Sequence, residues 1–174
     1  MGLARKKFEL IGAVLSLALL AGCTIQLAPS YDAGIVTGLN AANTQAQTMF
    51  ATVSSGVTKD TYSAREAQYN AMIGQFSALD AQIAARPMPQ PPSWFANHVL
   101  PSSDVNQIPR LNAPSKAALD HIVVTLTMMR DTDAAAGLAA APSCPASSSP
   151  TCGFKQDYMQ NFDSALTYES ALQR

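Results

Sequence analysis

The sequence has few of the residues and motifs from which active sites and metal sites are built. It has only two histidines, His98 and His121, and neither has the neighbouring cysteines or histidines of a metal site. It contains no G-x-S-x-G motif and no glycine-rich phosphate loop. Asp131 and Asp133 lack the glycine and the terminal glutamate of a calcium-binding loop, so we interpret them as a solvated helix face. These absences predict no enzymatic activity, no cofactor and no bound metal.

The sequence also lacks a hydrophobic run long enough to cross a bilayer. Its main apolar stretch, residues 10–21, spans about 12 residues, whereas a membrane-spanning helix needs about 20. Arg5, Lys6 and Lys7 precede this stretch. A basic start followed by a short apolar core is typical of a cleaved export signal.

The four residues that close the apolar stretch are Leu20-Ala21-Gly22-Cys23. They resemble the lipobox of a bacterial lipoprotein signal peptide. The resemblance implies cleavage between Gly22 and Cys23 and attachment of acyl chains such as palmitate to Cys23, each buried methylene adding ~0.8 kcal/mol of membrane affinity. Thr24, in place of an aspartate after the cysteine, implies a periplasm-facing protein of the outer membrane in a Gram-negative cell. The alternative is an ordinary secretory signal cleaved near Ala21 or Gly22.

Removal of residues 1–22 from the 174-residue chain leaves 152 residues, enough for one domain with a hydrophobic core. This mature chain has 8 basic and 11 acidic residues and a net charge of −3. A weak negative charge gives no electrostatic attraction for nucleic acid. The contacts that the lipoprotein resemblance implies are the membrane, through the N-terminal lipid, and an envelope protein partner.

The cysteine count is consistent with lipidation. If Cys23 carries lipid, Cys144 and Cys152 remain, and an even pair in an oxidising periplasm predicts a disulfide. Closing so short a loop, residues 144–152, stabilises the fold by roughly 2.5 kcal/mol. A metal pair or a redox pair is the alternative, although a redox motif requires C-x-x-C spacing.

Hydrophobic periodicity predicts an all-α domain over residues 31–174, preceded by a lipidated tether at residues 23–30. No alternating strand pattern of useful length is present. The expected architecture is bundle-like, with four helices at 31–54, 63–86, 115–136 and 154–172. Gly56 suits the end of the first helix, and Ser63 with Glu66 matches a capping box at the start of the second. The sequence does not determine where the third helix ends, because residues 134–141 are compatible with its extension past Gly137.

Each predicted helix has one apolar stripe, which we expect to face the core. The stripes are, in chain order, Ile35, Leu39, Ala42, Ala46, Met49 and Val53; Tyr62, Tyr69, Met72, Ile73, Phe76, Leu79 and Ile83; Leu119, Ile122, Val123, Leu126 and Met129; and Tyr158, Phe162, Ala165 and Leu166. An aromatic ligand groove is the alternative interpretation of Tyr62, Tyr69 and Phe76.

Residues 87–114 form a long proline-rich connection with no helical pattern. It contains Trp94 and Phe95, which we expect either to pack across the first two helices or to face a partner. The sequence thus predicts a lipid-anchored envelope protein with a structural, scaffold or protein-interaction role. The alternative is a helical module that binds a small apolar ligand, with Met49, Met72 and Met129 as adaptable lining.

Overall fold

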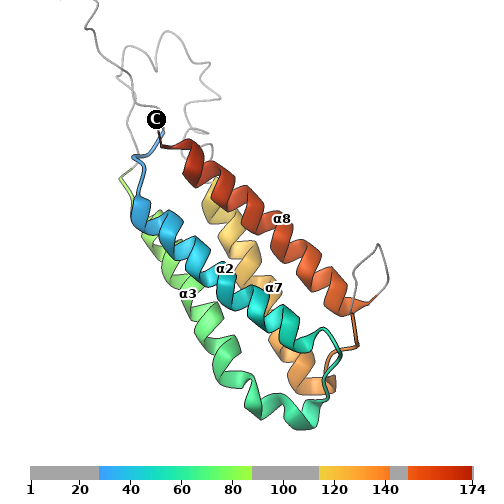
Figure 1. Cartoon of the computed structure of the whole chain (residues 1–174). Helices are drawn as coiled ribbons and strands as arrows, with labels where there is room; N and C mark the ends of the chain where they lie inside the picture. The colour runs from blue at the N-terminus through green and yellow to red at the C-terminus, as the bar shows by residue number, and fades with distance from the viewer. Residues whose placement is uncertain (1–27, 88–113, 142–148, 174) are drawn as a thin grey trace, which may run out of the picture.

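The computed structural model describes residues 28–87, 114–141 and 149–173, and within them the chain is all-α, as predicted. The four long helices of the described residues lie side by side in a bundle (Figure 1). Their bounds are α2 Ala33–Val53, α3 Glu66–Ala84, α7 Pro114–Ala136 and α8 Pro150–Ala171, with a short 3-10 helix, η1 Lys59–Ala64, between α2 and α3. None of the described helices is long and apolar enough to cross a membrane.

Successive helices run in opposite directions (Figure 1). α3 packs between α2 and α7, and α8 packs between α7 and α2, so α2 lies diagonally across the bundle from α7. The start of α2, the end of α3, the start of α7 and the end of α8 consequently lie at one end of the bundle, which we call the tether end. The end of α2, η1, the start of α3, the end of α7 and the start of α8 lie at the opposite end, which we call the distal end.

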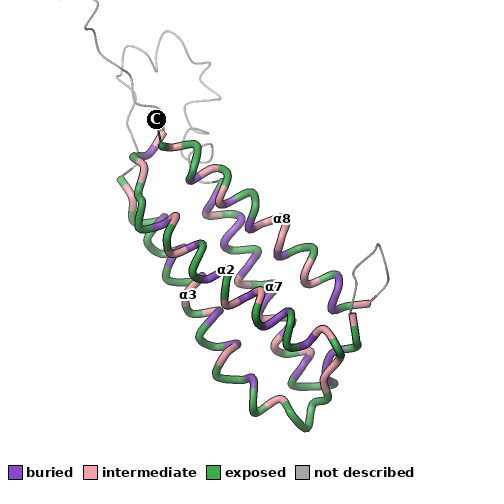
Figure 2. The backbone as a smooth tube through the Cα atoms, viewed as in Figure 1, coloured by how far each residue is buried: buried purple, intermediate pink, exposed green. Residues whose placement is uncertain are grey.

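The predicted apolar stripes form the core of the bundle. Almost all of their residues are buried in one hydrophobic cluster, and Tyr62, Ile73, Val123 and Leu166 are partly buried against it. Figure 2 shows the buried positions following the inner sides of the helices. Because a packed helix buries one residue in every three or four, the spacing in the sequence is sufficient to locate these side chains.

At the distal end, α2 and α7 are each followed by a glycine with positive φ. Gly56 (φ 82°) follows α2, as predicted, and Gly137 (φ 77°) ends α7, so residues 137–141 do not extend that helix. Val57 and Leu138 form an isolated antiparallel bridge, in which each amide donates to the other's carbonyl at 2.9 Å. A Cβ at Gly137 would lie 2.2 Å from the Val57 carbonyl oxygen, so this close approach requires glycine.

Two predicted helix starts are wrong. Ser63 lies within η1 rather than at a helix cap, and α3 begins at Glu66 after Arg65, with no side-chain cap bond. α8 begins at Pro150 rather than Phe154, because proline is well suited to a first helical turn, where its missing amide is not needed. The last three residues of the predicted 144–152 loop, ending in Cys152, are therefore helical.

Candidate functional site

Six of the candidate site residues that the sequence singled out lie outside the described residues. These are Gly22, Cys23, Trp94, Phe95, His98 and Cys144, and their predicted roles stay predictions. Cys152 is described: it is buried in the first turn of α8 and is disulfide-bonded. Since the other cysteines fall outside the described residues, the pairing with Cys144 also stays a prediction.

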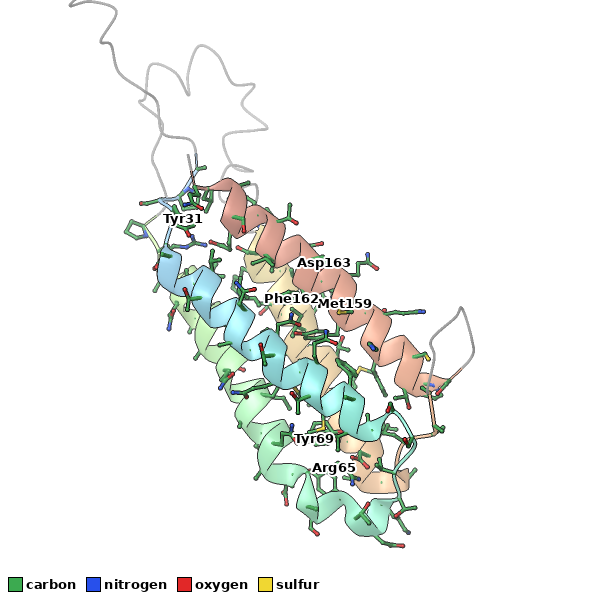
Figure 3. All side chains as sticks on the ribbon, viewed as in Figure 1. Tyr31, Arg65, Tyr69, Met159, Phe162 and Asp163 are labelled. Carbon is green, nitrogen blue, oxygen red and sulfur yellow. The ribbon has the colours of Figure 1, made fainter. Side chains whose placement is uncertain are left out.

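A buried ion pair between Arg65 and Asp133 closes the distal end. The Arg65 side chain donates from Nε to Asp133 Oδ2 at 2.9 Å and from Nη2 to Oδ1 at 2.7 Å. Tyr69 adds its hydroxyl to Oδ2 at 3.2 Å. Arg65 Nη1 also donates to the carbonyl and hydroxyl of Thr61, which lies in η1. Figure 3 places Arg65 and Tyr69 at this end. The network thus connects η1 and α3 to the end of α7.

The prediction of a solvated face is correct for Asp131 and wrong for Asp133. Asp131 is exposed and pairs with Arg130, whereas Asp133 has no exposed surface. The hydrogen bond to Asp133 raises the pKa of Arg65. Burial, together with the nearby Asp133 charge, raises the pKa of Tyr69. Arg65 therefore stays charged and Tyr69 stays neutral throughout the neutral pH range.

A second buried ion pair closes the tether end. Arg86 donates through both terminal nitrogens to Glu169, whose side chain is fully buried; the Nη1–Oε2 distance is 2.9 Å. Ser115 Oγ donates to Glu169 Oε1 at 2.6 Å. Arg86 Nη1 also donates to the carbonyl oxygen of Ser30, at 3.4 Å. One carboxylate thus holds together the chain before α2, the end of α3, the start of α7 and the end of α8.

Both buried carboxylates are engaged by guanidinium and hydroxyl donors, which favours a structural role. A carboxylate whose oxygens already accept hydrogen bonds from an arginine and a hydroxyl has few acceptor positions left for a substrate. Within the described ranges, no group of three or more His, Cys, Asp or Glu side chains is close enough to hold a metal ion.

Aromatic side chains fill the middle of the bundle around Tyr158. Its ring lies 5.3 Å from that of Phe50, 5.8 Å from that of Phe76 and 5.9 Å from that of Phe162, measured between centroids. The Tyr158 hydroxyl donates to Asn43 Oδ1 at 2.9 Å, which satisfies its one polar group. Burial raises the pKa of Tyr158.

The candidate ligand-lining residues are part of this core. Tyr69, Phe76, Met49, Met72 and Met129 are all fully buried in the hydrophobic cluster. The predicted core role of the aromatic series is confirmed for Tyr69 and Phe76.

Sequence reasoning did not identify Arg65, Asp133, Arg86 or Glu169 as structural residues. A usable signal exists for two of them, because Asp133 lies four residues after Met129 and Glu169 four after Ala165. Each acid therefore continues a stripe whose other members are buried, and a charge in that position requires a partner. The identity of that partner cannot be read from local spacing.

Outside the core, the outer side of α7 exposes two large hydrophobic side chains, Val124 and Met128. His121, on the same helix, is also exposed. Comparison of the chain with protein-family models, curated proteins and solved structures found no match to any of them.

Proposed function

We propose that this chain is a lipid-anchored bacterial envelope protein of the outer membrane, with a structural, scaffold or protein-interaction role and no catalytic activity. One observation carries the proposal: the chain just after the predicted lipidation site is fastened to the bundle. Pro29 is buried, and the carbonyl of Ser30 accepts a hydrogen bond from Arg86. Arg86 is in turn fixed by Glu169, so the anchor segment would be coupled to the folded domain.

The length of the free tether supports this interpretation. Only six residue steps separate Cys23 from Pro29, so a lipid on Cys23 would lie at most about 20 Å from the bundle. The tether end would then face the bilayer. The predicted partner-facing residues, Trp94 and Phe95, lie in the sequence between the end of α3 and the start of α7, and both of these helix ends are at the tether end. A partner bound there would be an envelope component near the membrane surface.

The pairing of the buried acidic side chains with arginines also supports a structural role. The fully buried acids, Asp133 and Glu169, are paired with arginines at the two ends of the bundle. The alternative, a module for a small apolar ligand, has no observation in the described ranges that favours it, since its candidate lining residues are core residues.

Metabolic labelling with a palmitate analogue tests the anchor. The full-length chain is expected to take up the label and to fractionate with the outer membrane, whereas Cys23→Ala should remain unlabelled. Thr24→Ala is the matched control for a change beside the cleavage site, and it should still be labelled. A wild-type chain without label, or a Cys23→Ala chain that fractionates unchanged, would contradict the anchor.

Co-purification from cross-linked membranes tests the interaction role. A specific envelope protein is expected with the full-length chain and not with Cys23→Ala. Trp94→Ala with Phe95→Ala should reduce its recovery if these residues form the contact. Recovery of the same proteins with the anchored and unanchored chains would contradict a scaffold held at the membrane.

A further inference from the structure

Six exposed residues form one line along the outer side of α7. We call this line the α7 stripe; its members are Ala117, His121, Val124, Met128, Asp131 and Ala135. Their spacing of four, three, four, three and four residues places them on one side of a helix. Val124 is 55% exposed and Met128 is 56% exposed, and among the described residues these are the large hydrophobic side chains that are exposed.

The α7 stripe points away from the core of its own bundle. The buried residues of α7, such as Ile122, Leu126 and Met129, occupy the opposite side of the helix. α3 and α8 pack against the two flanks of α7, which leaves the stripe uncovered by the described chain. Val124 and Met128, at positions i and i+4, are neighbours on this side of the helix and present one apolar contact to solvent.

The α7 stripe has a symmetric order about position 126. Ala117 and Ala135, His121 and Asp131, and Val124 and Met128 are each equally distant from that position. When two identical helices pack antiparallel about a two-fold axis, each residue meets its symmetric counterpart. We propose that the α7 stripe binds the α7 stripe of a second copy of this chain in this antiparallel arrangement.

In this antiparallel arrangement, the two side chains of each residue pair are complementary in size or in hydrogen bonding. Val124 would pack on Met128 of the second copy, and the small residues Ala117 and Ala135 would let the helices approach closely. The His121 imidazole, a hydrogen-bond donor, would face the Asp131 carboxylate, whose Oδ1 also accepts hydrogen bonds from Arg130 of its own copy. Because the axis repeats every contact, each of these pairs occurs twice.

The charges select the antiparallel arrangement over the parallel one. In a parallel pair each residue meets its own copy, so Asp131 would face Asp131, and Asp120 would face Asp120. Like charges at such positions are destabilising. In the antiparallel pair Asp120 faces Thr132 instead, and it keeps its contact with Lys116 in the same copy, at 2.9 Å.

The size of the α7 stripe predicts a weak dimer. It is about 27 Å long, from 18 residue steps of 1.5 Å. With two large apolar side chains per copy, it belongs to the small, transient class of interfaces. Confinement of the chains to a membrane surface, which rests on the proposed anchor, would raise the dimer population.

Disulfide trapping between two differently tagged full-length chains tests the arrangement. One chain carries Val124→Cys and the other Met128→Cys, and membranes or detergent extracts are oxidised and analysed without reductant. The mixed-tag dimer is expected to exceed each same-tag dimer several-fold. Thr37→Cys, at an exposed position on the diagonal helix α2, is the matched control and should give only collisional background.

Charge exchange provides a second readout. His121→Asp should reduce trapping several-fold, and the added change Asp131→His should restore it, because the pair is then reversed rather than removed. Predominant same-tag dimers, trapping no greater than that of Thr37→Cys, or no rescue by the double exchange would each overturn the antiparallel pairing. Since the detergent extract needs no anchor, these outcomes are separable from a failure of the proposed function.

Discussion

Arg65 and Asp133, which are 68 residues apart in the sequence, form a two-point ion pair in which the carboxylate is completely buried. The arginine comes from the start of α3 and the aspartate from the last turn of α7. Their contact fixes how the second half of the domain meets the first at the distal end.

Asp133→Asn should destabilise the domain by about 3–5 kcal/mol, because it leaves the buried Arg65 charge without a counter-charge. Denaturant unfolding followed by circular dichroism measures the change. Asp131→Asn is the control two residues away; its side chain is exposed, so its effect should stay within about 0.5 kcal/mol. Equal losses of unfolding free energy in the two variants would show that the buried ion pair contributes no more to stability than the exposed one.

Arg86→Ala should loosen the tether end. The variant removes the donor to Ser30 and leaves the Glu169 carboxylate buried without its arginine, a loss of about 3–5 kcal/mol. Hydrogen exchange should then speed up at the start of α2 and at the start of α7. Lys116→Ala is the control, since its ion pairs are partly exposed and contribute less than about 1 kcal/mol. Unchanged exchange at both helix starts in Arg86→Ala would contradict the coupling.

Stability should fall at alkaline pH because burial raises the pKa of both Tyr69 and Tyr158. The unfolded chain loses these phenol protons near pH 10, while the folded chain keeps them, so stability is fully present below about pH 10 and decreases above it. Denaturant midpoints measured across this range should show the decline. Tyr158→Phe should make the decline shallower, and an identical slope would contradict the role of burial.

Gly137→Ala and Gly74→Ala should have opposite effects. Alanine at 137 would have to adopt a positive φ and would place its Cβ against the Val57 carbonyl, so we expect a loss of more than about 1 kcal/mol. Gly74 lies in α3 with open space around its Cβ position, so alanine there should stabilise the helix by about 0.5–1 kcal/mol. Thermal unfolding of the two variants checks both signs.

The core could be predicted from the sequence because helical burial is periodic. Ile35, Leu39 and Met49 follow from spacing alone, and each is fully buried. The start of α3 could not be predicted from the Ser63–Glu66 pattern. Ser63 is part of η1, and Arg65, the residue before α3, is held by the distant Asp133. The same long-range contact explains why Asp133 looked like a surface residue: nothing near it in the sequence carries its partner.

The positions of the two buried ion pairs have a consequence for the sliding of helices past one another. Apolar stripes of similar side chains tolerate a shift of one helical turn, about 5.4 Å, since one hydrophobic contact replaces another. Arg65–Asp133 lies at one end and Arg86–Glu169 at the other. Such a shift would therefore leave buried charges without their partners at both ends. The two pairs therefore define a single axial register for a core that would otherwise accept several.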